Sequence, residues 1–246
     1  MEAGGHPIVV ITGGATGIGE LLSKTDSLCV MGDTQASLCQ IQVSLAADGQ
    51  EPNGARRFID GTTEDYMSRL FGTLRQMGYV VRDIEAAMKH WTEVLQVGPF
   101  FYMDRVKMID FRYRDKPSDL WCSVGLAQCG PVQIELIEQR NDAASMYHDF
   151  LAAGREGLQH IAFWADQDEF DSMVLRAERA GFDVAMSGAS VDASGRFVYF
   201  SQEQHPGTAI ELSCVTAAKK QIFEMVADAA RNWDGTQPIR RLDTAK

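Results

Sequence analysis

The alternation of apolar and polar positions through the middle of the chain follows one plan that occurs twice. Residues 76–98 begin as a strand, turn at Arg82-Asp83 and continue with apolar side chains at helical spacing. Residues 160–182 follow the same plan, with a turn at Asp166. The helical positions are Ile84, Met88, Trp91 and Leu95 in the first stretch, and Phe170, Val174, Ala177 and Ala180 in the second. Each stretch therefore predicts a strand followed by an amphipathic helix.

Three short strand candidates follow each of these stretches, and the last of the three carries a glutamate between apolar residues. The last strands contain VQIEL at residues 132–136 and TAIEL at residues 208–212. The candidates span residues 104–114, 118–128 and 131–139 in the first copy, and 182–188, 195–203 and 208–215 in the second. The sequence therefore predicts an α+β fold with two βαβββ modules, at residues 74–142 and 156–215.

The segments on either side of this repeat have different patterns. Near the N-terminus, IVVITGGATGIGELL predicts a strand, a glycine-rich turn and a short helix within a small α/β unit. Near the C-terminus, TAAKKQIFEMVADAARNW predicts an amphipathic helix that packs on the rest of the chain or on a second copy, followed by a polar tail. The predicted domains are residues 1–73, 74–217 and 218–246.

Composition narrows the class of partner. The chain has 246 residues, of which 45% are hydrophobic, so it can bury substantial cores. Its formal net charge of −11 makes nucleic acids and anionic membranes poor partners. No apolar run approaches the roughly 20 residues that span a bilayer, and the first residues lack the pattern of a signal peptide. We therefore expect a cytoplasmic protein with a small-molecule substrate, and a homodimer is left open.

The two glutamate-containing strands pose a specific question. Because side chains alternate between the faces of a strand, Glu135 points away from Ile134 and Leu136. The same holds for Glu211 between Ile210 and Leu212. A carboxylate within an otherwise apolar strand faces either water or a group that needs the negative charge.

A tandem βαβββ chain with these features resembles the vicinal oxygen chelate superfamily, which includes glyoxalase I, methylmalonyl-CoA epimerase and bleomycin resistance proteins. The resemblance covers residues 74–215. It implies a cup-shaped sheet in which the first and last strands of both modules hold a metal ion. In this sequence the corresponding positions are Gln76, Glu135, His160 and Glu211.

Residue chemistry supports the same four positions. They recur at equivalent places in two copies of one unit, so a pseudo-twofold arrangement would bring them to one point. An amide oxygen, an imidazole nitrogen and two carboxylates suit a divalent ion such as Zn²⁺, Ni²⁺, Co²⁺, Mn²⁺ or Mg²⁺. The two carboxylates would balance the charge of the ion, which lowers the penalty for burying them. Taken singly, each residue also fits an ordinary structural role.

The order Gln, Glu, His, Glu resembles that of glyoxalase I, which implies a lyase or isomerase acting through an enediolate. Glu211 and Glu135 are then the candidate proton carriers. Two alternatives are an epimerase of the methylmalonyl-CoA type and a non-catalytic ligand-binding or resistance protein. Ring-cleaving dioxygenases need two histidines and one carboxylate, whereas this set contains one histidine.

The glycine-rich stretch of residues 1–73 resembles the cofactor loop of short-chain dehydrogenases. That resemblance implies nucleotide contacts by Gly13, Gly17, Gly19 and Asp33. However, only about ten residues separate Gly19 from the next strand candidate, too few for the usual crossover helix. No tyrosine is followed by a lysine four positions later, so the catalytic pair of that family is missing. We therefore expect a truncated Rossmann-like unit and do not expect NAD(P) as the cofactor; a relic, an interaction surface and a weak nucleotide site are all left open for residues 1–73.

Overall fold

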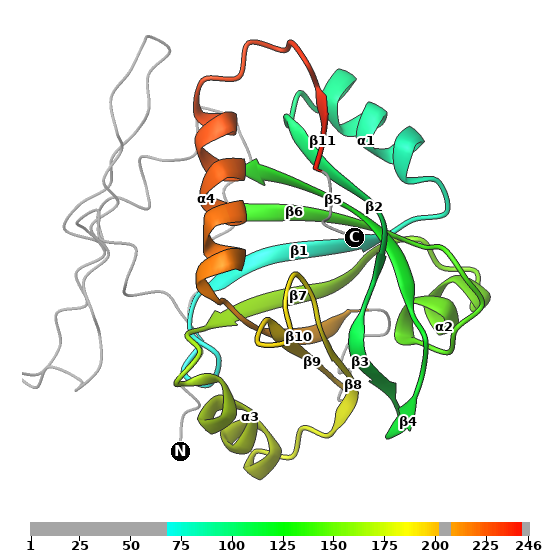
Figure 1. Ribbon diagram of the computed structural model, residues 1–246, viewed down its shortest axis with the longest axis vertical. Helices are drawn as coiled ribbons and strands as arrows, with labels where there is room; N and C mark the ends of the chain where they lie inside the picture. The colour runs from blue at the N-terminus through cyan, green and yellow to red at the C-terminus, as the bar shows by residue number, and fades with distance from the viewer. Residues whose placement is uncertain (1–67, 202–207, 243–246) are drawn as a thin grey trace, which may run out of the picture. The chain divides into compact units, whose positions relative to one another are not determined.

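The structure is a computed structural model that describes residues 68–201 and 208–242. These residues form a mixed α+β fold around an 11-stranded sheet (Figure 1). The α+β class predicted from the sequence is therefore confirmed. The N-terminal Rossmann-like unit lies outside the described residues.

The first module begins with a strand, a helix and a second strand, and ends with a pair of long antiparallel strands. Its elements are β1 (Leu74–Val80), α1 (Ile84–Glu93), β2 (Phe100–Lys107), β5 (Trp121–Cys129) and β6 (Val132–Gln139). Helix α1 begins where the Asp83 carboxylate accepts a hydrogen bond from the Ala86 amide at 2.9 Å. Strand β6 pairs in parallel with β1, so the first and last strands of the module are neighbours.

The second module repeats this arrangement after a short helix, α2 (Met146–Ala152). Its elements are β7 (Gly157–Ala165), α3 (Phe170–Arg179), β8 (Val184–Ala189), β9 (Arg196–Phe200) and β10 (Ala209–Cys214). Strand β10 pairs in parallel with β7, as β6 pairs with β1. The predicted βαβββ pattern is thus present in both halves.

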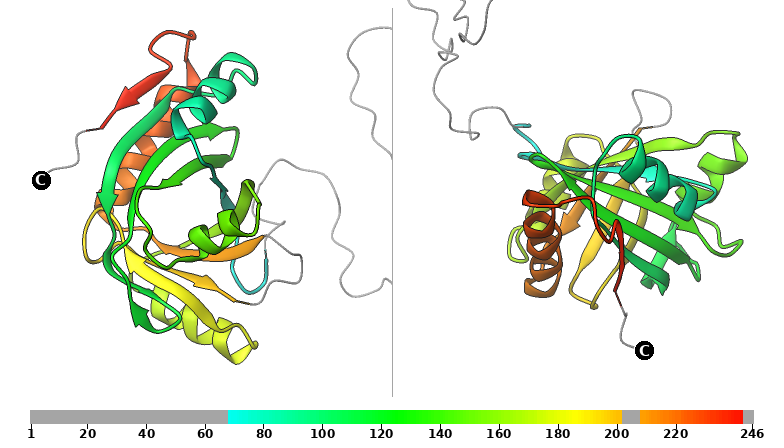
Figure 2. Two further views of the ribbon diagram at one scale, coloured as in Figure 1. Left: turned by 90° about the vertical axis from the view of Figure 1, so that its right-hand side faces the viewer. Right: turned by 90° about the horizontal axis from the view of Figure 1, so that it is seen from above.

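The two modules join within one chain, because their first strands, β1 and β7, pair antiparallel. The order across the sheet is β11-β2-β5-β6-β1-β7-β10-β9-β8-β3-β4. The sheet is strongly curved, as Figure 2 shows from two further directions. The first and last strands of both modules therefore occupy the four central positions.

Two details differ from the sequence-based prediction. The strand expected at residues 104–114 is interrupted, and its second part, β3 (Ile109–Tyr113), pairs with β4 (Lys116–Pro117) and with β8 of the other module. Positive φ angles at Arg105 and Asp110 accompany this change of direction. The expected polar tail contains a short strand, β11 (Ile239–Arg241), which pairs in parallel with β2.

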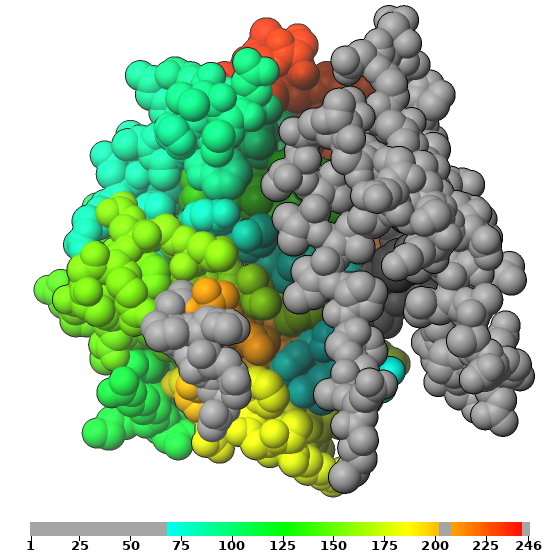
Figure 3. Space-filling model, turned by 180° about the vertical axis from the view of Figure 1, so that it is seen from behind, coloured from blue at the N-terminus to red at the C-terminus, as the bar shows by residue number. Residues whose placement is uncertain are grey.

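The helices cover opposite faces of the sheet. Met88 of α1 lies beside Gly125 of β5 on one face, which is the side seen in Figure 3. Helix α4 (Ala217–Arg231) crosses the other face, where Phe223 stacks on Trp164 of β7 with ring centroids 4.5 Å apart (Figure 1). The predicted C-terminal helix therefore packs on its own chain. No described helix is long and apolar enough to cross a membrane.

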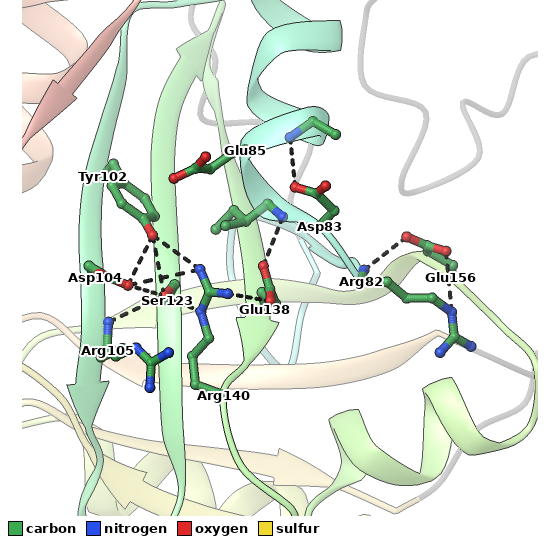
Figure 4. Close-up of polar contacts among 12 residues, drawn as sticks. Arg82, Asp83, Glu85, Tyr102, Asp104, Arg105, Ser123, Glu138, Arg140 and Glu156 are labelled. Carbon is green, nitrogen blue, oxygen red and sulfur yellow. Dashed lines mark hydrogen bonds and ion pairs between the residues drawn. The ribbon is translucent and has the colours of Figure 1, made fainter.

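A polar network on the face that carries α1 ties β2, β5 and β6 together (Figure 4). The Arg140 guanidinium contacts Glu138 and donates to Ser123 Oγ at 2.7 Å and to the Tyr102 hydroxyl at 3.2 Å. Glu138 also accepts from the Ile84 amide at 2.9 Å, at the first residue of α1. These partners satisfy the charges locally, so the network has a structural role.

Candidate metal centre

The central strands place the functional side chains on one face of the sheet through their pairing register. Gly78 of β1 lies opposite Glu135 of β6 on one side and His160 of β7 on the other. Ala209 of β10 continues this row beside His160. Because residues opposite one another in a ladder share a face, Glu135 and His160 approach each other across the glycine.

A second row of residues lies on the same face, two residues further along each of the four strands. It contains Gln133, Gln76, Ala162 and Glu211, on β6, β1, β7 and β10. The two rows are related by the repeat, since 160 − 76 = 162 − 78 = 84 and 211 − 135 = 209 − 133 = 76. Gln76 thus corresponds to His160 and Glu135 to Glu211, as the sequence pattern predicted.

The structure brings Glu135, His160 and Glu211 together at one point. Their possible ligand atoms all lie within 4.8 Å of one another. His160 Nε2 lies 3.3 Å from Glu135 Oε2 and 3.2 Å from Glu211 Oε2. Ligand atoms about 2.1 Å from a tetrahedral metal are about 3.4 Å apart. The observed separations therefore match a metal-binding set with little rearrangement.

Gly78 makes this arrangement sterically possible. A Cβ atom at this position would lie 1.8 Å from His160 Cε1 and 2.0 Å from His160 Nε2. The imidazole consequently occupies the space that any other side chain at residue 78 would fill. The histidine is completely buried, so its ring has little freedom to move elsewhere.

Three neighbouring side chains orient the histidine. Its Nδ1 lies 2.9 Å from Gln159 Oε1, an oxygen that only accepts, so Nδ1 carries a proton and Nε2 faces the carboxylates. The Tyr199 hydroxyl lies 3.3 Å from Nε2, and Tyr199 in turn accepts a hydrogen bond from the Tyr147 hydroxyl at 2.8 Å. This chain of buried polar groups fixes the plane of the ring.

Burial and mutual charge shift the pKa values of the three residues. Burial alone would lower the pKa of His160, but the Glu135 and Glu211 carboxylates outweigh it and raise the pKa to about 9. Burial raises the pKa of Glu135 above its ordinary value, and the neighbouring Glu211 adds to the effect. Burial opposes ionisation of Glu211 as well, yet hydrogen bonds from His160 and Tyr199 hold its pKa below the ordinary value. The two carboxylates therefore favour the protonated form of the imidazole that lies between them.

Gln76 is buried on the same wall, and its Nε2 donates to Gln133 Oε1 at 2.7 Å. That bond leaves the Gln76 Oε1 atom available as a ligand. Gln76, Glu135 and Glu211 thus line one cavity, and His160 is buried directly behind them, in contact with both carboxylates.

The centre lies in the wall of a cavity of about 760 Å³ between the curved sheet and α4. Most of the lining is apolar and comes from β2, β5, β6 and α4. Representative residues are Val106, Val124, Leu126, Ile137, Ile222 and Phe223. The cavity therefore offers a few polar groups on one wall and a much larger apolar surface around them.

Sequence reasoning missed several polar residues of this cavity, namely Tyr147, Tyr199, Ser213 and Lys219. Tyr199 lies opposite Glu211 in the β9–β10 ladder, so it shares the face that carries the candidate ligands. The alternation of the expected strand at residues 195–203 was visible, but its register was not. The cofactor-loop residues Gly13, Gly17, Gly19 and Asp33 lie outside the described residues.

Comparison with known families identifies the class of this domain. A family model described as "Glyoxalase/Bleomycin resistance protein/Dioxygenase superfamily" matches residues 75–200, which is more than half of the chain. The chain therefore belongs to this superfamily. The resemblance noted for residues 74–215 is confirmed at that level.

Several solved structures are similar to this chain at low sequence identity. Methylmalonyl-CoA epimerase from Mycobacterium tuberculosis is 18% identical, with a TM-score of 0.44, and the match covers 63% of this chain and 96% of that one. A selenomethionine methylmalonyl-CoA epimerase is also 18% identical, with a TM-score of 0.39, covering 61% and 99%. An epimerase in complex with methylmalonyl-CoA and ammonium is 17% identical, with a TM-score of 0.40, covering 59% and 95%. No curated protein matches the chain.

Proposed function

We propose that the protein is a metal-dependent lyase or isomerase of the glyoxalase I type, acting through an enediolate on a small oxygenated substrate. The observation that supports it is the convergence of Glu135, His160 and Glu211 within 4.8 Å at the wall of a large cavity. Membership in the superfamily agrees with such a reaction, because the superfamily includes metal-dependent isomerases and epimerases.

The residues fit a divalent ion. His160 Nε2, one oxygen from each of Glu135 and Glu211, and the Gln76 amide oxygen would hold it. The two carboxylates balance its charge, and the space opposite Gly78 keeps the histidine in place. When bound, the ion would accept two neighbouring oxygens of a substrate and stabilise negative charge on them.

The protein supplies the proton transfer. Glu135 and Glu211 belong to β6 and β10, the strands that flank the central β1–β7 pair. Their oxygens lie within 4.8 Å of each other, and in this proposal they reach a bound substrate from the strands on either side of that pair. One carboxylate would take the proton from a carbon next to the oxygens, and the other would return a proton at the neighbouring carbon or on the opposite face. The buried tyrosine pair keeps His160 oriented during these steps.

The same two-sided arrangement favours a second candidate, an epimerase. Epimerisation needs a proton removed from one face of a carbon and returned on the other, which two opposed carboxylates accomplish directly. Return of the proton to the original carbon distinguishes epimerisation from isomerisation. The product formed from a chiral substrate would therefore separate the two reactions.

Metal content and proton exchange test the proposal. The protein should be purified without chelators and assayed for one divalent ion per chain, with Glu135→Ala expected to lose it. Exchange of solvent deuterium into a panel of α-oxygenated carbonyl compounds should occur with the wild type and fall at least 100-fold in Glu211→Gln. Glu178→Gln, at an exposed position on α3, is the matched control. Bound ligand without exchange would indicate the non-catalytic alternative, and absence of metal would refute the proposal.

A further inference from the structure

Lys219, in the first turn of α4, is a buried cation in the wall of the same cavity. Its side chain is only 3% exposed, and it lines the cavity together with Ser213 and Glu211. The ammonium donates to Ser213 Oγ at 3.0 Å. Among the described residues this is its one hydrogen-bond partner, although an ammonium has three donors. No carboxylate in the described part of the chain pairs with it at ion-pair distance.

Local structure holds the lysine in this position. Thr216 caps α4 by accepting from the Lys219 amide at 3.3 Å, and its hydroxyl donates to Asp192 at 3.3 Å. The aliphatic stem passes Gly195, where a Cβ atom would lie 3.0 Å from Lys219 Cε. The absence of a side chain at Gly195 thus leaves room for the buried stem of Lys219.

The charge of the cavity is unbalanced once a metal is bound. A divalent ion neutralises Glu135 and Glu211, and His160 is then a neutral ligand. Lys219 adds one positive charge that no described carboxylate pairs with directly. The amino-terminal end of α4 strengthens the positive potential, because the helix dipole and Lys220 in the same turn have the same sign. Arg105 and Lys107 also line the cavity, and in the described part of the chain only Lys107 is paired, with Asp119, so a metal-loaded cavity has a net positive charge.

The position of the lysine relates it to the reacting centre. Ser213 lies two residues beyond Glu211 on the same strand and the same face, which corresponds to about 7 Å. An anionic group held by Lys219 and Ser213 would therefore lie next to oxygens bound at the metal position. Burial lowers the pKa of Lys219, against the influence of Glu211 and Glu135, and an anion beside the ammonium would keep it charged.

We propose that Lys219 and Ser213 form the subsite for a carboxylate, and that the substrate is a 2-hydroxy or 2-oxo acid anion with an apolar body. The carboxylate offsets the positive charge that Lys219 adds beside the metal position, and the apolar body contacts the walls formed by Val124, Leu126 and Phe223. This inference rests on the proposed function, because the charge count includes the metal.

The test uses mandelate, a 2-hydroxy acid with a phenyl body, and mandelamide, which has nearly the same shape without the charge. Binding of both to the metal-loaded protein is measured by isothermal titration calorimetry after the metal affinity itself has been determined. The wild type should bind mandelate at least tenfold more tightly than mandelamide. Lys219→Met should remove that preference and bind the metal equally well or more tightly, because a nearby positive charge has been removed.

Loss of the mandelate preference without loss of metal affinity separates an anion subsite from a structural role, because a structural defect would weaken the binding of both. Lys220→Met is the matched control, since Lys220 is exposed on the same helical turn and pairs with Glu224. Lys219→Gln keeps a hydrogen-bond donor and replaces the first variant if that one does not fold. A wild type that binds metal but does not prefer mandelate, or a preference that survives in the Lys219 variants, overturns the subsite. A wild type that binds no metal overturns the proposed function, and the subsite with it.

Discussion

Replacing Gly78 by alanine should destroy the metal centre while leaving the sheet folded. The added Cβ would lie 1.8 Å from His160 Cε1, which is 1.6 Å closer than an ordinary contact of 3.4 Å (3.4 − 1.8 = 1.6). Metal–ligand distances tolerate about 0.2 Å, so a ring displaced this far no longer serves as a ligand. We expect the affinity for Zn²⁺ or Co²⁺ to fall at least 100-fold.

The effect of Gly78→Ala on stability should be modest by comparison. Overpacking a buried site costs about 1–3 kcal/mol, and alanine recovers about 0.5–1 kcal/mol relative to glycine within a strand. Calorimetric metal titration and thermal unfolding followed by circular dichroism give the two quantities separately. Gly125→Ala is the control, because its Cβ would lie 3.1 Å from Sδ of the flexible Met88 side chain and at an ordinary 3.4 Å from Phe100 Cδ1. Wild-type metal affinity in Gly78→Ala would show that the glycine is not required and that the assigned centre is wrong.

Three further outcomes follow from the same geometry. Tyr199→Phe should weaken metal binding by about 10–100-fold, the usual effect of losing an orienting partner, and calorimetry would detect it; unchanged affinity would assign the tyrosine a packing role only. Metal affinity should decrease as the pH is lowered below about 9, because the raised pKa of His160 means that a proton must leave Nε2 before a metal binds; titrations between pH 6 and 8 that give a constant affinity would contradict this. A chelator should lower the melting temperature of the wild type, since a ligand at 100 times its dissociation constant adds about 2.7 kcal/mol to the free energy of unfolding. The melting temperature of Glu211→Ala should not change, and equal shifts in both proteins would argue against the centre.

The repeat in the sequence, together with the family resemblance, predicted four converging residues, and the structure brings Glu135, His160 and Glu211 within 4.8 Å of one another. Side-chain alternation assigned Glu135 and Glu211 to faces, and duplication placed Gln76 and His160 at equivalent positions in the two copies. The antiparallel β1–β7 pair then brings these equivalent positions to one point. Local pattern and internal symmetry are both readable from one sequence, so this part of the site did not require coordinates.

Other features depend on tertiary pairing that leaves little trace in the sequence. The β3–β4 hairpin leaves its own module at a bulge next to Arg105 and pairs with β8, which extends the sheet of the second module. The apolar-polar alternation changes phase at Met108-Ile109, where β2 ends and β3 begins, but nothing in it indicates that β3 pairs with the other module. The short strand β11 likewise depends on the free edge of β2 rather than on its own pattern.

The burial of Lys219 is a third feature that the sequence pattern does not predict. Within the amphipathic pattern of α4 a lysine is expected on the solvent side, and Lys220 follows that expectation, with a side chain that is 68% exposed. Lys219 is instead buried because the first turn of α4 lies over Ser213 and the end of β10. Only the placement of the helix distinguishes these two adjacent lysines, and that placement determines which one can reach a bound ligand.

The modules depart from symmetry at the positions that face the candidate ligands. His160 faces Gly78, whereas its counterpart Gln76 faces Ala162, which corresponds to Gly78 in the other copy. The bulky ring requires the missing Cβ, and the flexible amide coexists with one. Gly78 therefore leaves room for the ring of His160, and Ala162 leaves enough room for the amide of Gln76. Duplication accounts for four converging positions, and this pairing of glycine with histidine converts them into one asymmetric site.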